Sequence, residues 1–195
     1  MTTPEVPARR GLILTSAAEL FARKGIGATT VREIADAVGV LSGSLYHHFE
    51  SKDAIVEEIL SGYLDTIQER YAQVLDSGKA PADCLHDLVL CSLQVVSEQP
   101  YATAIYQNEL HYLREQQRFA SVLAAAAGIQ HTWLRVIEKG VADGAFRDDI
   151  DPRVFYRLIR DAVWLSVRWQ HPDPPAQLAG DIITIFLHGF AAPAR

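Results

Sequence analysis

Hydrophobic residues recur roughly every three to four positions over most of this chain, which is the spacing of one face of an α-helix. No stretch alternates polar and apolar residues as a half-buried β-strand would. Proline and glycine mark the ends of the periodic stretches. Beyond residue 52 the pattern predicts helices over about residues 53–76, 81–98, 101–113, 118–142, 151–169 and 174–189. The fold is therefore predicted to be all-α, with about nine helices in total.

The stretch TTVREIADAVGVLSGSLYHHFESK, residues 29–52, predicts two short helices joined by a tight turn. Thr30 and Glu33 have the spacing of a capping box, so the first helix should begin there. Gly39 should end it, because glycine accepts the left-handed backbone conformation that often follows a helix. Either Ser42 or Ser44 can cap the second helix.

The second helix should place Leu45 and Phe49 inward and leave a small, polar and aromatic face outside. That face consists of Gly43, Ser44, Tyr46, His47 and His48. Small hydroxyls, a glycine and ring donors at the start of a helix suit close approach to base edges and phosphates. Helical hairpins with a solvated polar face also occur outside DNA-binding proteins, so the spacing alone leaves both interpretations open.

The residues themselves resemble a known family. TTVREIADAVGV, then GSLYHHF, then SK, is similar to the DNA-binding domain of TetR-family transcriptional regulators, continuously over about residues 14–59. The upstream AAELFARKGIGATT resembles the first helix and following turn of that domain. The family usually has a small hydroxyl residue after Gly39 and Val40, where this chain has Leu41, so Ser42 is expected to replace it as the cap.

LSGSLYHHF is also similar to a subset of the family, the actinobacterial KstR-type repressors of sterol catabolism. The similarity is greatest to the second of these repressors, whose effector is a steroid-derived CoA thioester. The resemblance implies a DNA-binding domain over residues 1–52 and an effector-binding and dimerisation domain over 53–195. It implies a homodimer on palindromic double-stranded operator DNA. The implied DNA contacts are Thr30, Arg32, Ser42, Gly43, Ser44, Tyr46, His47 and Lys52.

The net charge of −6 is unusual for a DNA-binding protein, but the charge is unevenly distributed. Residues 1–52 hold six Lys and Arg against five Asp and Glu, whereas residues 53–195 hold twelve against nineteen. A weakly charged N-terminal part predicts few phosphate contacts per protomer and a dependence on dimerisation. The candidate phosphate ligands are Arg9, Arg10, Arg32 and Lys52.

Composition bounds the remaining possibilities. A chain of 195 residues with 49% hydrophobic content can form one domain or two small ones, and no apolar run is long enough to span a membrane. The N-terminus lacks the apolar region of a signal peptide, so cytoplasmic residence is expected. Cys84 and Cys91 lie about 10 Å apart by helical rise, which predicts free thiols. No Cys and His spacing indicates a metal site, and no cofactor is expected.

The last two predicted helices are candidates for a dimer interface. Leu178, Ile182, Ile185, Phe186 and Gly189 share a face of the last one. The apolar side of the helix before it comprises Phe155, Leu158, Ile159, Ala162, Leu165, Ser166 and Trp169. A four-helix interface between two protomers is expected, although these faces could also cover the chain's own core.

An arginine-rich stripe lies on the helix predicted over residues 151–169. Its members are Arg153, Arg157, Arg160, Trp164 and Arg168, at spacings of four, three, four and four. Guanidinium groups match phosphates and carboxylates, and an indole can stack on a planar group such as adenine. A solvated face balanced by nearby acids is the alternative. The KstR-type resemblance of IRDAVWLSVRW implies that Arg160, Trp164 and Arg168 contact the CoA thioester.

An acyl group would need an apolar pocket, for which Tyr106, Glu109, Leu110 and Trp133 are the main candidates, with Ile105, Leu113, Phe119 and Leu123 beside them. An aromatic stripe at helical spacing is more often core than ligand site. Two alternatives remain within the family: an effector of another class, either a fatty acyl-CoA or a hydrophobic drug with Glu109 as counter-ion, and a helical regulator without a ligand. Catalysis is not expected, because the chain has no nucleophile elbow, phosphate loop or metal spacing.

Overall fold

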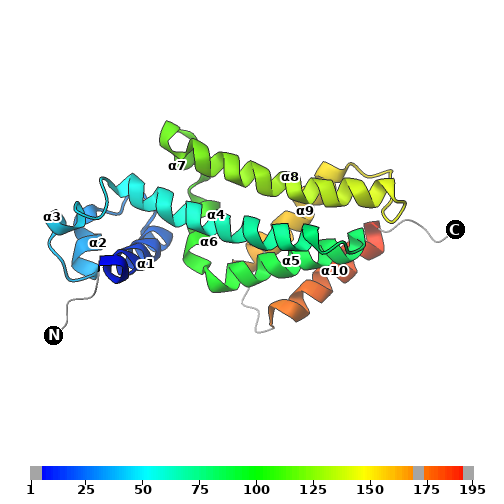
Figure 1. The fold of residues 1–195 in the computed structure, drawn as a ribbon, viewed down its shortest axis with the longest axis horizontal. Coiled ribbons are helices and arrows are strands. Elements are labelled where there is room, and N and C mark those ends of the chain that lie inside the picture. Colours follow the sequence, from blue (N-terminus) through cyan, green and yellow to red (C-terminus); the bar gives the residue numbers. More distant parts are fainter. Residues whose placement is uncertain (1–5, 169–173, 191–195) are drawn as a thin grey trace. The chain divides into compact units, whose positions relative to one another are not determined.

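The computed structural model describes residues 6–168 and 174–190, and within them the chain is all helix. Ten α-helices and two short 3-10 helices are present there, and no β-strand (Figure 1). The first helices are α1 (Val6–Lys24), α2 (Val31–Ala37), α3 (Ser42–Leu45), α4 (Lys52–Asp76), α5 (Pro81–Glu98) and α6 (Pro100–Asn108). They are followed by α7 (Leu110–Arg114), η1 (Gln117–Phe119), α8 (Ala120–Ala142), α9 (Pro152–Trp164), η2 (Leu165–Arg168) and α10 (Pro175–Phe190).

The helices form two compact units. Unit 1 holds the described residues up to Leu64 together with residues 101–124, and unit 2 holds residues 65–100 and the described residues from 125 onward. Helices α4 and α8 each contribute to both units, whereas α6, α7 and η1 belong with the N-terminal helices. The boundary predicted at residue 52 does not coincide with the boundaries of the two compact units.

Local signals in the sequence account for most helix boundaries. Ser51 caps α4 by accepting a hydrogen bond from the backbone N–H of Ala54, at 3.1 Å. Asp151 caps α9 by accepting from the N–H of Arg153, at 2.8 Å. Helix α5 begins at Pro81 and ends at Glu98, as predicted. The all-α prediction is therefore confirmed.

Three helices differ from the prediction. The helix expected over residues 101–113 is divided at Glu109 into α6 and α7, which raises the number of α-helices from about nine to ten. The helix expected from residue 118 begins with the 3-10 turn η1, and α8 then passes through Gly128 without a break. Helix α9 ends at Trp164 and continues as the 3-10 helix η2, while Trp169 lies outside the described residues.

Each unit has its own hydrophobic core. In unit 1 helix α2 packs against α1 and α3, and Ile13, Ile34 and Leu45 are fully buried. In unit 2 helix α5 packs against both α9 and α10. Cys84 is buried and Cys91 is half-buried, and both are free thiols, as the spacing predicted. Among the described residues, no helix is both long enough and apolar enough to cross a membrane.

Candidate DNA-binding interface and effector region

Helix α3 presents the outward face that the sequence predicts. Leu45 is fully buried and Phe49 is nearly so, and together they fix this helix on the core of unit 1. Gly43, Ser44, Tyr46 and His47 are exposed, while Ser42 and His48 are half-buried. The structure therefore keeps Gly43 and Ser44 of α3, and Tyr46 and His47 of the following turn, available to DNA. Helix α3 ends at Leu45, so Phe49 lies outside the helix in which the sequence predicted it.

The cap of α3 differs from the expectation. Leu41, not Ser42 or Ser44, occupies the N-cap position, and the structure has no side-chain hydrogen bond there. Ser42 is instead the first residue of the helix. The Leu41 carbonyl accepts the first helical hydrogen bond, from the N–H of Ser44 at 2.9 Å, so backbone contacts alone start this short helix. The Ser42 hydroxyl therefore does not serve as the helix cap.

Thr30 has a structural role at the start of α2. Its hydroxyl accepts from the N–H of Glu33 at 3.2 Å, and the Glu33 carboxylate accepts from the N–H of Thr30 at 2.9 Å, which confirms the capping box. A salt bridge to Lys24, with the bonds from Thr30, lowers the pKa of Glu33 to about 2. Arg32, two residues after Thr30, is exposed and faces Asp36 one turn later, with 3.8 Å between Nε and Oδ2.

Lys52 holds the turn between α1 and α2. Its Nζ donates to the carbonyl of Ile26 at 2.6 Å and to that of Thr29 at 2.9 Å, and the side chain is half-buried. Both acceptors belong to the backbone of unit 1. In this arrangement the ammonium group stabilises the loop, and its implied contact with a DNA phosphate stays a prediction.

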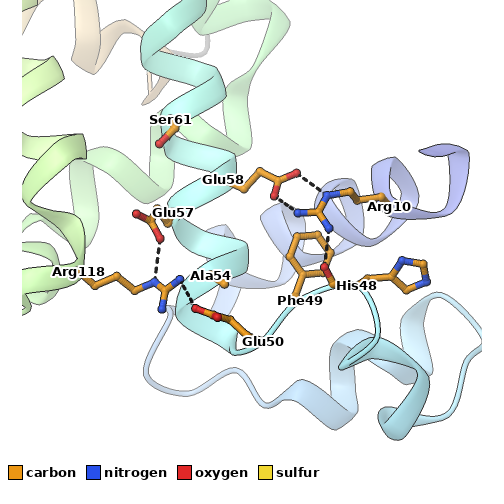
Figure 2. A pocket seen from close by; sticks show the side chains of 9 residues that line it. All are labelled: Arg10, His48, Phe49, Glu50, Ala54, Glu57, Glu58, Ser61 and Arg118. Atoms are coloured by element: carbon orange, nitrogen blue, oxygen red, sulfur yellow. Dashed lines mark hydrogen bonds and ion pairs between the residues drawn. The ribbon is translucent and has the colours of Figure 1, made fainter. Parts of the chain in front are cut away.

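Arg10 and Arg118 each form hydrogen bonds with the segment between α3 and α4. They lie on two sides of the first turns of α4 (Figure 2). The Arg10 guanidinium pairs with Glu58, donates to the carbonyl of His48 and lies over the Phe49 ring, 4.1 Å from its centroid. The hydrogen bond with Glu58 raises the pKa of Arg10. Its donors are therefore already occupied within unit 1, although it was a candidate phosphate ligand.

Arg118, on η1, was not singled out in the sequence. Its Nε donates to Glu57 at 2.8 Å and a terminal nitrogen donates to Glu50 at 2.7 Å (Figure 2). The neighbouring Tyr112, on α7, donates to the Asp53 carboxylate at 2.7 Å. These contacts bridge about sixty residues of sequence, so no local pattern could have indicated them. Arg10 and Arg118, with Glu50, Glu57 and Glu58, border an open cavity of about 520 Å³ in unit 1.

The effector candidates on α6 and α7 lie in unit 1. The Tyr106 ring is 6.4 Å from that of Tyr63, measured between centroids. Glu109 lies against the turn after α1, because a Cβ added to Gly25 would come within 3.0 Å of its Oε1. Leu110 and Tyr106 are both half-buried. These side chains line the junction of α6 and α7 with the N-terminal helices.

Trp133 lies in the core of unit 2. It is 1% exposed, and its indole Nε1 donates to the Tyr71 hydroxyl at 3.0 Å. The Tyr71 hydroxyl also bonds the hydroxyl of Ser92, and burial raises the pKa of this phenol. The Tyr156 ring packs on the other side, with 6.1 Å between centroids. The indole N–H of Trp133 therefore already has a hydrogen-bond acceptor within the protein, as is usual for a residue of a structural core.

The arginine stripe is only partly continuous. Arg153 and Arg157 are exposed on α9, and Arg160 is half-buried and paired with Asp161. Trp164 is the last residue of α9. Because a 3-10 helix turns about 120° per residue and an α-helix about 100°, Arg168 is rotated away from the line that continued α-helix would give. The spacing argument therefore fails for Arg168, which lies exposed on η2.

An exposed apolar strip lies beside these arginines. Val154, Leu158 and Leu165 are 46%, 59% and 40% exposed, and Ile185 on α10 is 72% exposed. Several residues expected at the dimer face, namely Phe155, Ile159, Ser166 and Ile182, are instead buried within this protomer. Leu178, Ala162 and Phe186 are half-buried. The burial of Gly189, and all of Trp169, lie outside what the structure describes. The residues that remain candidates for the dimer interface are therefore the exposed ones, Leu158, Leu165 and Ile185.

Two family models match this chain. The model described as "Bacterial regulatory proteins, tetR family" covers residues 13–59, and the model of a "Tetracyclin repressor-like, C-terminal domain" covers residues 78–190. The chain belongs to the TetR family. Proteins of this family bind operator DNA and small-molecule effectors and are not enzymes. The family resemblance noted in the sequence is confirmed.

Similar proteins refine the placement within the family. The TetR-type regulator described here is 42% identical over 188 residues to the HTH-type transcriptional repressor KstR2 of Rhodococcus jostii, covering 95% of this chain and 92% of that protein. The solved ketosteroid transcriptional regulator KstR2 of Mycobacterium tuberculosis has a TM-score of 0.88 at 39% identity, covering 98% and 99% of the two chains. AibR, solved with isovaleryl coenzyme A and operator DNA, shares the fold with a TM-score of 0.77 at 21% identity, covering 91% and 97%. The chain is a TetR-type repressor related to KstR2.

Proposed function

We propose that this repressor binds a palindromic operator as a homodimer and is released by the CoA thioester of a cyclic or steroid-derived acid. The observation that carries the proposal is the similarity to KstR2 proteins, which are 40–42% identical in sequence to this chain over 95% of its length. Similarity that includes both the N-terminal and the C-terminal domain supports a shared operator-binding and effector-binding plan. The function is divided between residues 1–52, which contact DNA, and residues 53–195, which bind effector and form the dimer.

Dimerisation is supported by the exposed apolar strip of unit 2. Leu158, Leu165 and Ile185 are large side chains that a protomer alone leaves in water. Their burial against a second copy would remove apolar surface from water, and a helix-turn-helix dimer places two recognition helices on two half-sites. The flanking Arg153 and Arg157 then form a polar rim, which interfaces commonly have.

The effector proposal rests on charge and on apolar surface. Arg160, Trp164 and Arg168 can meet phosphates and an adenine ring, as charge-assisted hydrogen bonds and stacking require. Tyr106, Glu109 and Leu110 belong to unit 1, and their mixed apolar and polar character makes them a separate set of candidates for contact with an acyl group. AibR provides a protein of this fold that was solved with an acyl-CoA. Trp133, by contrast, is a buried residue of unit 2 bonded to Tyr71, and it is not proposed to touch the ligand.

Helix α4 is proposed to transmit the response. Its first turns carry partners of Arg10, Arg118 and Tyr112, close to the segment that follows the recognition helix, and its later turns belong to unit 2. An effector that binds one arrangement of these contacts better than another shifts the population toward that arrangement. The operator is then released, because in the favoured arrangement the two recognition helices of the dimer no longer fit both half-sites.

The test is a titration of operator-bound protein. The operator is first selected from random duplexes, and small molecules that copurify with the protein are identified by mass spectrometry. A steroid-derived CoA thioester, a fatty acyl-CoA and a cationic hydrophobic drug are then compared for release in a gel-shift assay. Release by the steroid thioester alone is expected. Release only by one of the others, or by none, contradicts the proposed effector.

A matched pair of variants locates the ligand. Arg168→Met should weaken the thioester by about 10- to 150-fold, the range of a lost charge-assisted hydrogen bond. Arg135→Met removes an exposed arginine of α8 in the same unit and should leave the titration unchanged. Both proteins should bind the operator as wild type does when no ligand is present. Equal release curves for all three proteins would assign the arginine stripe to solvent or to the dimer rim.

A further inference from the structure

Leu41 is the large hydrophobic side chain with the greatest exposure among the described residues, at 80%. A single exposed leucine is common on protein surfaces and needs no explanation by itself. Its position is what distinguishes it, because it is the N-cap residue of α3, directly before Ser42, Gly43 and Ser44. Residues at this end of a recognition helix meet base edges in the major groove.

The backbone around Leu41 is well fixed although the side chain is in solvent. Gly39 adopts a φ of +69°, and the next N–H, of Val40, donates to the Ala35 carbonyl at 3.0 Å. The Leu41 carbonyl accepts from Ser44, and Leu45 is fully buried one helical turn later. The side chain is thus presented outward from a rigid support, which suits a contact that discriminates between bases.

The side chains of the remaining face favour such a contact. Residues 41–48, LSGSLYHH, contain no Arg, Lys, Asn, Gln, Asp or Glu. Bidentate recognition of guanine or adenine, and acceptance from cytosine, normally come from those side chains. Serine hydroxyls bond donors and acceptors alike and discriminate weakly. The apolar group that distinguishes one base pair in the major groove is the 5-methyl of thymine, and an aliphatic side chain is its natural partner.

We infer that Leu41 packs against the 5-methyl group of one thymine in each operator half-site and sets the base preference at that position. This inference rests on the proposed operator binding as a dimer. Leu41 acts by apolar contact, so it adds sequence discrimination without adding a charge. Its contribution is therefore independent of salt concentration, unlike that of a phosphate contact.

Replacement of thymine by deoxyuridine removes only the methyl group and tests the contact directly. Operators selected by the wild-type protein are resynthesised with uracil at each thymine of the half-site in turn. One position should weaken binding about fourfold per half-site, the fold-change that corresponds to one buried methyl group. Leu41→Ala should bind the thymine and uracil operators equally, because the partner of the methyl group is gone.

Leu12→Ala provides the matched control, since Leu12 is a 54% exposed leucine on α1 of the same unit. It should keep the wild-type sensitivity to uracil, and Leu41→Ser should select operators without the thymine preference. An enriched operator that has no uracil-sensitive thymine, or one whose sensitivity survives in Leu41→Ala, would overturn the inference. A wild-type protein that enriches no sequence would overturn operator binding itself, and this inference with it.

Discussion

The segment between α3 and α4 in unit 1 and the centre of unit 2 hold different kinds of polar contact. Around the segment that joins α3 to α4, unit 1 uses charged groups at partly exposed positions, such as Arg118 with Glu50 and Glu57. The centre of unit 2 uses buried aromatic and hydroxyl groups, with Trp133 bonded to Tyr71. Exposed ion pairs contribute little free energy and are screened by salt, whereas buried aromatic contacts are large and insensitive to salt.

This difference matters for a regulator whose DNA binding responds to a small-molecule effector. Contacts of small individual free energy can exchange partners at low cost, and regions that move are drawn from the less stable parts of a protein. The contacts of Arg10, Arg118 and Tyr112 are of this kind, and they surround the end of the recognition helix. The aromatic core of unit 2 offers instead a rigid support. Four substitutions test the comparison.

Trp133→Ala should produce the largest effect. Removing a fully buried indole should lower the free energy of unfolding by about 3–5 kcal/mol, through lost burial and the cavity left behind. Urea unfolding at fixed protomer concentration measures it. Trp164→Leu, at a half-buried position of the same unit, should cost distinctly less. If Trp133→Ala retains wild-type stability and loses only ligand affinity, Trp133 is a ligand residue and not the core of unit 2.

Lys52→Met should lower the free energy of unfolding by about 2 kcal/mol, because two backbone carbonyls lose a charged donor. Its operator affinity should keep the wild-type dependence on salt if the bonds to Ile26 and Thr29 are the only role of the ammonium group, which has a third N–H available for a phosphate. Arg32→Met, at an exposed position, should leave stability within about 0.5 kcal/mol. A salt slope reduced by about one in Lys52→Met would restore the role as phosphate ligand that the family resemblance implies.

Arg118→Met should reduce the effect of the effector on operator affinity, and it should change the free energy of unfolding only slightly. Without its bonds to Glu50 and Glu57, the segment after α3 is no longer tied to η1, so ligand binding should release DNA less completely. The measurement is operator affinity with and without saturating effector. Arg114→Met, an exposed arginine of α7, is the control and should respond as wild type does. An unchanged ratio of affinities in Arg118→Met would remove this residue from the transmission of the signal.

Glu33→Gln should have the smallest effect and should appear only in acid. The pKa of Glu33 is lowered from 4.5 to about 2, mainly by Lys24, so the folded protein holds this carboxylate more strongly ionised than the unfolded chain does. Its stabilising contribution is therefore full above pH 4.5 and is lost as the pH falls toward 2. Thermal unfolding of Glu33→Gln should depend less on pH across that window than wild type, and parallel curves would contradict the assignment.

The local parts of the fold follow from short stretches of sequence. The capping box at Thr30, the glycine at position 39 and the caps of α4 and α9 each depend on residues within four positions of one another. The period of apolar residues likewise predicts which side of each helix is buried, as at Leu45 and Phe49. The structure differs from the predicted helices at Glu109, where one helix ends and another begins, and after Trp164, where α-helix changes to 3-10 helix. Neither position has a proline or glycine that would have indicated the change.

The sequence by itself determined an all-helical chain of the TetR family, with a helix-turn-helix near the N-terminus, because these properties rest on local spacing and on a continuous motif. Tertiary structure decided what the charged and aromatic side chains do. Lys52 and Arg10 bond within unit 1, Arg118 reaches back to Glu50, and Trp133 is satisfied by Tyr71. Each of these outcomes depends on partners distant in sequence. The free energy of a polar group depends on whether such a partner or water surrounds it, and only the folded chain brings the partner near.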